Sequence, residues 1–186
     1  MKIKSQQLID ELKAITQQLL SDAESLKAKD LSELQQQPES DKWNALMCLE
    51  HLNRYGDFYL PEIKSRLAYS THEADEYFKG GLLGNYFAES MKPKEKLNKM
   101  NTFKSMNPID DTLDKDTIDT FIAQQKEMLN LLDDARDKSL KKTKTAISIS
   151  KWIKLRLGDT FRIVIYHNQR HMVQAFNAIN QLKQHA

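Results

Sequence analysis

Residues 166–174 read YHNQRHMVQ, and this segment places His167 and His171 four positions apart. It lies in a run without glycine or proline that extends from Asp159 to residue 186, which favours one long helix. Residues four apart in a helix lie on one face, a turn from each other. The two imidazoles can therefore share a metal ion. The same spacing also occurs by chance in ordinary helices, so other parts of the sequence must decide between the two interpretations.

The helix predicted over 159–184 carries both histidines on its inner face. Asp159 and Thr160 follow Gly158 and form an N-cap pair. The apolar stripe consists of Val164, His167, His171, Ala175, Ala178 and Leu182. Unpaired imidazoles in a core stripe cost free energy because they lose their hydrogen bonds to water. Two of them in one stripe therefore favour a metal site.

A third histidine, His51, belongs to a helix predicted over 41–68. Ser40 and Asp41 are its expected N-cap pair, and Pro61 is expected to kink or break it. On a helical wheel, His51 shares a face with apolar residues: Met47, Cys48, Tyr55 and Phe58. A histidine on such a face is either neutral and hydrogen-bonded or bound to a ligand. The wheel leaves both possibilities open.

The remaining periodicity predicts an all-α fold built as a four-helix bundle. Further apolar stripes predict helices over 3–28 and 116–138. The scarcity of turn residues, with 5 Gly and 4 Pro, agrees with long helices. The connection over 69–116 is long enough to cross the bundle, so that the second and third helices run parallel. We also expect a short helix within 80–91 and an extended piece at 146–149.

Composition and charge narrow the range of functions. The net charge of +2 does not call for nucleic acid or a membrane as a partner. Cys48 is the only cysteine, which excludes an intrachain disulfide and favours a reducing compartment. We see neither a signal peptide nor a run that would span a bilayer, so we expect a cytoplasmic chain that forms a single domain over 1–186. The sequence leaves a homodimer open.

Three other features of the sequence concern charged residues and a histidine outside the cluster. The segment 138–158 holds seven Lys or Arg residues and no acid, and is either a solvated link or a surface for a partner. His72 lies among acidic residues in the long connection, and we expect it on the surface. Glu50 and Arg54 have the spacing of a solvated ion pair.

Several of these residues together resemble the DinB-like family of metal-dependent four-helix-bundle proteins. The residues that carry the resemblance are Trp43, Glu50-His51-Leu52, Tyr59-Leu60-Pro61, His167-Asn168-Gln169-Arg170-His171 and Gln174. The resemblance implies an up-down-down-up bundle and a three-histidine metal site formed by His51, His167 and His171. Members with assigned chemistry include thiol-dependent transferases and isomerases that use bacillithiol or mycothiol. The resemblance does not imply DNA binding.

The chemistry of three imidazoles agrees with this expectation. Three neutral histidines leave a divalent ion with an open position, as in catalytic metal sites. Zinc is the default ion, and Ni, Fe, Mn or Co use the same ligands. We expect a metal-dependent hydrolase or thiol-dependent transferase acting on a small molecule, with a low-molecular-weight thiol as one candidate. The alternatives are a bundle that binds metal or ligand without turnover and an interaction module.

No catalytic acid or base can be named from the sequence. Glu50 is adjacent to His51 but points about 100° away on a helix. Trp43 and Tyr55 are candidate pocket walls. Arg170 and Gln174 are candidates for orienting a substrate or a group next to the metal ligands. An alternative role for Arg170 is to pin the fourth helix to the first through a carboxylate.

Overall fold

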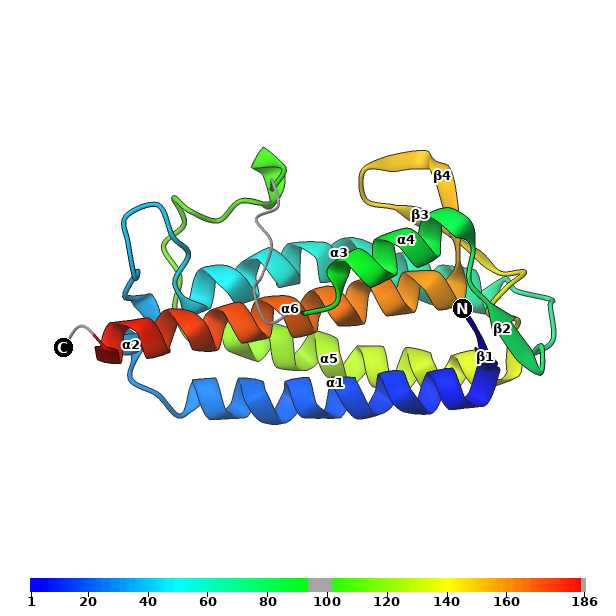
Figure 1. The fold of residues 1–186 in the computed structure, drawn as a ribbon, viewed down its shortest axis with the longest axis horizontal. Helices are drawn as coiled ribbons and strands as arrows, with labels where there is room; N and C mark the ends of the chain where they lie inside the picture. The colour runs from blue at the N-terminus through cyan, green and yellow to red at the C-terminus, as the bar shows by residue number, and fades with distance from the viewer. Residues whose placement is uncertain (94–101, 185–186) are drawn as a thin grey trace.

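The computed structural model describes residues 1–93 and 102–184, although for Lys151 and residues 182–184 it describes the backbone alone. Most of the described chain is helical, which confirms the all-α prediction. The long helices are α1 (Ser5–Lys27), α3 (Ala45–Ala68), α5 (Asp116–Asp134) and α6 (Leu157–Gln184). They lie side by side along the long axis of the molecule (Figure 1). In that view α1 and α6 run from the end with the strands toward the end with α2, and α3 and α5 run the other way.

The shorter elements sit at the ends and on one side of these helices (Figure 1). The short helices are α2 (Leu31–Gln35), α4 (Leu82–Met91), and the 3-10 turns η1 (Lys104–Met106) and η2 (Ala135–Asp137). Strand β1 (Lys2–Lys4) pairs antiparallel with β2 (Tyr77–Lys79), and Ile3 lies opposite Phe78. Strand β3 (Lys144–Ile147) pairs antiparallel with β4 (Ser150–Arg156). Helix α4 and strand β3 occupy the places where a short helix and an extended piece were expected.

Apolar faces of the long helices form two groups of buried residues along the bundle. One group lies toward the strand end and includes Leu8, Ile63, Phe78 and Phe161. The other lies toward the α2 end and includes Leu19, Leu49, Phe121 and Met172. Burying side chains of this size stabilises the fold by about 1.5–3 kcal/mol each. The apolar stripes therefore face inward, as the three-four spacing predicted.

The start of α3 differs from the sequence prediction. The helix begins at Ala45 rather than near residue 41, and its N-cap is Asn44 instead of Ser40 or Asp41. The Asn44 side chain accepts a hydrogen bond of 2.8 Å from the Met47 amide. It also donates to the Gln35 carbonyl, 2.8 Å away, and so ties the cap to the end of α2. This tertiary contact selects Asn44 from several cap-competent residues in the segment.

Two further details also differ. Helix α3 continues through Pro61, so the predicted break is absent. Helix α6 begins at Leu157, so Asp159 lies inside its first turn instead of capping it. Asp159 is fully buried and pairs with Arg162. Its role is therefore tertiary: it accepts a hydrogen bond from the Gly81 amide and so connects α6 to the start of α4.

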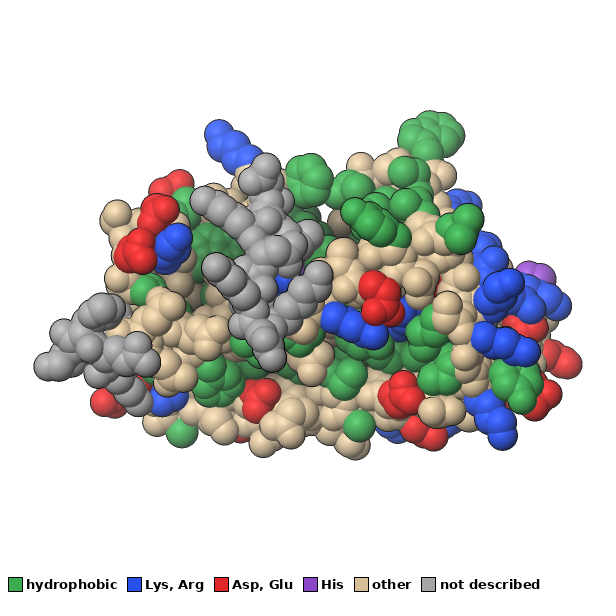
Figure 2. All heavy atoms as spheres, in the orientation of Figure 1, with side chains coloured by type: hydrophobic (Ala, Val, Ile, Leu, Met, Phe, Trp, Pro, Cys, Tyr) green, Lys and Arg blue, Asp and Glu red, His purple; other side chains and the backbone are tan. Residues whose placement is uncertain are grey.

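The connection over 69–116 packs against two of the long helices where it is described. Helix α4 lies along α6, and η1 lies on α3. Helix α4 and the β3–β4 hairpin leave exposed apolar side chains on one face, among them Leu82, Tyr86 and Trp152. Green side chains gather in this region of Figure 2. Among the described residues, no helix combines the length and apolar character that a membrane-spanning segment needs.

Candidate metal centre

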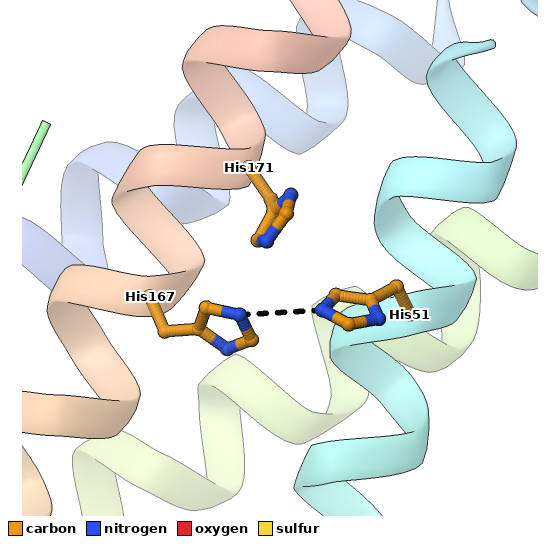
Figure 3. Close-up of side chains that lie close together, drawn as sticks. All are labelled: His51, His167 and His171. Atoms are coloured by element: carbon orange, nitrogen blue, oxygen red, sulfur yellow. Dashed lines mark hydrogen bonds between the residues drawn. The ribbon is translucent and has the colours of Figure 1, made fainter. Parts of the chain in front are cut away.

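The three histidines that the sequence singled out come together between α3 and α6. His51 lies in the second turn of α3, and His167 and His171 lie one turn apart near the middle of α6. Their potential ligand atoms all lie within 4.8 Å of one another, a spacing compatible with a shared metal ion. The rings point toward one another across the gap between the two helices (Figure 3). His72, in contrast, is exposed, and His185 lies outside the described residues.

Hydrogen bonds fix the orientation of two of the three rings. The His51 Nδ1 atom lies 2.7 Å from the Met106 carbonyl oxygen. Because a carbonyl only accepts, this nitrogen carries the proton, and Nε2 keeps its lone pair toward the cluster. His171 donates in the same way from Nδ1 to Gln174 Oε1, 2.9 Å away. Gln174, one of the two orienting candidates from the sequence, thus contacts His171, which also keeps its Nε2 lone pair.

His51 and His167 also contact each other directly. Their Nε2 atoms lie 3.3 Å apart, marked by the dashed line in Figure 3. Since Nε2 of His51 has no proton, His167 donates its proton across this gap. For a metal ion to bind all three Nε2 atoms, the His167 proton would move to Nδ1, which keeps that imidazole neutral. The donor set is therefore suited to a divalent ion that binds neutral imidazoles.

His51 is buried and His167 and His171 are half-buried, and desolvation favours the neutral form of all three imidazoles. The His51 side chain is 3 % exposed, and desolvation lowers its pKa to about 4. Desolvation, followed by the charge of neighbouring His51, lowers the pKa of His171 to about 3. The pKa of His167 is also well below the usual value, first by desolvation and then by its two histidine neighbours. Near neutral pH, the cluster therefore has the protonation state that metal binding requires.

Aromatic rings surround the cluster. Trp43 packs against His51 and His171, with ring centroids 4.8 and 5.8 Å away. Tyr55 contacts His51 and His167 edge-on, each at 5.0 Å. The positions suggested as pocket walls thus lie directly against the histidines. Desolvation raises the pKa of Tyr55, so its hydroxyl stays protonated and available as a donor.

One part of the site was missed from the sequence, namely the segment 103–111, which we call the crossover segment. Its Met106 carbonyl orients His51, and its Asn107 side chain accepts a hydrogen bond from Trp43 Nε1 at 3.1 Å. Arg54 holds it to α3 through the carbonyls of Ser105 and Asn107. The expected Glu50–Arg54 pair is present at 3.1 Å, but Arg54 is half-buried rather than solvated. A backbone carbonyl leaves no sequence signal, whereas Arg54 one turn after His51 was a visible clue.

Other candidates have plain structural roles. Cys48 is fully buried, and desolvation raises its pKa, so it is a packing residue instead of a nucleophile. Arg170 is 5 % exposed, and desolvation lowers its pKa. Glu50 points to Arg54.

Long helices that bring together one buried and two half-buried histidines define a helical protein with a candidate metal centre between α3 and α6. The chain belongs to the DinB superfamily, whose family model matches residues 28–175. The match includes all three histidines and most of the helical core. No curated protein and no solved structure matches the chain.

Proposed function

We propose that this chain is a metal-dependent enzyme whose divalent ion is held by His51, His167 and His171. The observation that carries the proposal is the orientation of the rings. His51 and His171 each donate from Nδ1 to a fixed oxygen, which leaves Nε2 for a ligand. Metal-ligating histidines generally have such a partner, because it fixes both the tautomer and the ring plane.

The residues present suit catalysis better than a closed structural site. Three protein ligands leave a tetrahedral ion one position for water or substrate. The ion, when bound, would supply Lewis acidity and favour the deprotonated form of a water or thiol ligand. Tyr55 and Trp43 would exclude bulk water, and the protonated Tyr55 hydroxyl would be a donor to a small substrate. We name no general base.

The finer proposal is a hydrolase or a thiol-dependent transferase that acts on a small molecule, with a low-molecular-weight thiol as one candidate. DinB superfamily membership and the open coordination position support it. We further propose that residues 1–186 form one domain in the cytoplasm, with up-down-down-up connectivity inferred from the helix directions in Figure 1. Zinc is the first metal to test, followed by Ni, Fe, Mn and Co.

Metal content and affinity test the site. Protein purified without a histidine tag should contain close to one equivalent of a divalent metal, or bind added zinc in a calorimetric titration. Replacing a ligand with His167→Ala should weaken zinc binding by about a hundredfold or more, since loss of a ligand's hydrogen-bond partner alone costs 10–100-fold. The matched control is His72→Ala, which removes an exposed histidine far from the cluster and should change nothing.

Turnover separates the enzyme from a bundle that binds metal without reacting. The zinc-loaded protein should hydrolyse activated esters or transfer a thiol to an electrophile, and His167→Ala should abolish this activity. Metal binding with no turnover across such a panel would leave a metal- or ligand-binding protein. Failure of all five metals to bind would leave an interaction module.

A further inference from the structure

The crossover segment is attached to the metal centre mainly through polar contacts. Its 3-10 turn η1 buries none of its residues, so apolar packing of η1 contributes little. It is held instead at the Met106 carbonyl by His51 and at the Asn107 side chain by Trp43. Both holding residues also contact the histidine cluster. The segment is thus a wall of the site in which Pro108 is buried, while the η1 turn next to His51 is held by hydrogen bonds.

Arg54 makes the largest number of these attachments. Its Nη1 atom donates to the carbonyls of Ser105 and Asn107, each at 3.2 Å. Its Nη2 atom pairs with the Asp111 carboxylate. The two carbonyls flank Met106, so the guanidinium fixes the backbone on both sides of the carbonyl that orients His51. The three guanidinium nitrogens thus bond the two carbonyls, Asp111 and Glu50 together, which the single nitrogen of a lysine ammonium cannot do.

Helix α3 contains a second arginine, Arg66, that forms the ion pair within the helix but, among the described residues, makes no hydrogen bond to the crossover segment. Arg66 pairs with Glu62 four residues before it, at 2.8 Å, as Arg54 pairs with Glu50 at 3.1 Å. Within the described part of the chain, Arg66 makes its hydrogen bond to Glu62 and none to the crossover segment. An ion pair with the glutamate four residues earlier is thus common to both arginines of α3. The additional contacts of Arg54 serve the segment.

We propose that Arg54 is a positioning residue of the metal centre and that metal binding is coupled to docking of residues 103–111. Arg54 holds the Met106 carbonyl in place, the carbonyl fixes His51 Nδ1–H, and Nε2 is thereby aimed at the ion. Coupling between two sites is reciprocal. A bound ion that fixes the His51 ring therefore also holds the segment on α3. This inference rests on the metal site proposed above.

Three variants test the proposal, each with zinc titration and hydrogen exchange. Arg54→Met keeps the side-chain length and removes every donor, and should weaken zinc binding by about tenfold, the lower end of the cost of losing a ligand's hydrogen-bond partner. Arg54→Lys should lose nearly as much because a single ammonium nitrogen does not reach the two carbonyls and the two carboxylates together. The control Arg66→Met should bind zinc within about twofold of the unaltered chain, as expected for a surface pair.

Hydrogen exchange gives a readout that a merely structural role would not produce. In the unaltered chain, zinc should slow the exchange of backbone amides in residues 104–111, because a docked segment opens less often. Zinc should have no such effect in Arg54→Met and its full effect in Arg66→Met. The cobalt-loaded proteins give a second signature, since a reoriented His51 ring should change the visible absorption of Arg54→Met alone.

The outcomes separate this inference from the proposed function. If the unaltered chain binds none of the metals, the proposed function is wrong and this inference falls with it. If it binds zinc but Arg54→Met binds equally well, or zinc leaves the exchange of 104–111 unchanged, only the inference is wrong. Asp111→Asn, measured in parallel, loosens Arg54 from the opposite side. It should weaken zinc binding in the same direction if Arg54→Met fails to fold.

Discussion

At the scale of single residues, the histidine cluster gives this chain a marked pH dependence. Burial lowers the pKa of His51 from its usual 6.5 to about 4. In the unfolded chain the same residue takes up a proton near pH 6.5, whereas in the folded chain it does not until the pH is much lower. The folded state therefore binds fewer protons in this range, and the free energy of unfolding falls as the pH falls.

We predict that the metal-free protein loses stability between pH 6.5 and 4. At pH 5 the contribution from His51 alone is about 2 kcal/mol relative to pH 7, because one pKa unit corresponds to about 1.4 kcal/mol. Urea unfolding at several pH values measures the loss. The variant His51→Gln, which has no titrating group there, should lose about 2 kcal/mol less over the same interval. Parallel profiles for the two proteins would contradict the neutral, buried state of His51.

The same shift affects competition between protons and metal. Exposed imidazoles would release an ion as the pH falls through about 6–7. Because the pKa values of His51 and His171 lie near 4 and 3, protons compete for these ligands only in more acidic solution. At neutral pH, His51 and His171 are therefore neutral because of desolvation, and their bonds to Met106 and Gln174 leave the Nε2 lone pairs unprotonated.

At the scale of helices, the cap of α3 shows how a tertiary contact decides a boundary. Asn44 caps the helix and also donates to the Gln35 carbonyl. Ser40 and Asp41, which the sequence favoured, are both exposed. A side chain that hydrogen-bonds both to the helix end and to a neighbouring element stabilises that helix start more than a cap residue exposed to water.

We predict that Asn44→Ala lowers the free energy of unfolding by about 1 kcal/mol or somewhat more, the usual cost of losing an N-cap. The matched change at the position suggested by the sequence, Ser40→Ala, should alter stability by less than about 0.5 kcal/mol, as is normal for surface substitutions. Chemical denaturation of both variants makes the comparison. A larger loss for Ser40→Ala would place the functional cap at the earlier residue.

Helix α4 depends on a close approach to α6. A Cβ atom added at Gly84 would lie 2.6 Å from the Asp159 Cβ atom, a distance at which one backbone must move. In an exposed helix interior, the change from Gly to Ala would stabilise by about 1 kcal/mol. Here the gain is outweighed, since overpacking of this kind costs about 1–3 kcal/mol.

We therefore predict that Gly84→Ala lowers the melting temperature, in contrast to the usual effect of this substitution in a helix. The comparison is Tyr86→Ala in the same helix, where the side chain is 68 % exposed and truncation should change stability little. Calorimetry of both variants gives the answer. An increase in melting temperature for Gly84→Ala would show that α4 does not need to lie this close to α6.

At the scale of the whole molecule, an ion cluster built on the buried Asp159–Arg162 pair connects α4, in the segment 69–116, to α6. Arg162 and Asp159 are both fully buried and lie 3.1 Å apart. Arg162 also pairs with Glu89 at 2.6 Å and donates to Asn85 at 3.1 Å, both on α4. Charges of this kind hold a unique arrangement because an unpaired member is costly in the core.

We predict that Arg162→Met destabilises the protein by about 3 kcal/mol or more, because it leaves the Asp159 carboxylate buried without its partner. Desolvation already raises the pKa of Asp159, which indicates how little solvation remains there. The double variant Arg162→Met with Asp159→Asn should recover part of the loss, since neither charge is then unpaired. Additive losses in this double-mutant cycle would show that the two residues are not coupled.

Much of this architecture follows from local sequence patterns. The three-four spacing of apolar residues predicted the long helices, because helical periodicity is a local property. The same periodicity placed His51, His167 and His171 on inward faces. Predicted helix ends differed from the observed ones by a few residues, since several side chains compete for each end. The strand pairs β1–β2 and β3–β4 are short, and their pairing depends on contacts with the rest of the fold more than on local sequence.

By itself, the sequence determined the helical periodicity, the inward faces of the histidines and the resemblance to a superfamily to which the chain belongs. Only the tertiary structure decided that the Met106 carbonyl orients His51, that Arg54 holds the crossover segment, and that Asp159 is buried against Arg162. The physical reason is that periodicity acts over one helical turn. A buried hydrogen bond or ion pair instead forms only where segments far apart in the sequence pack against each other and exclude water from the polar groups.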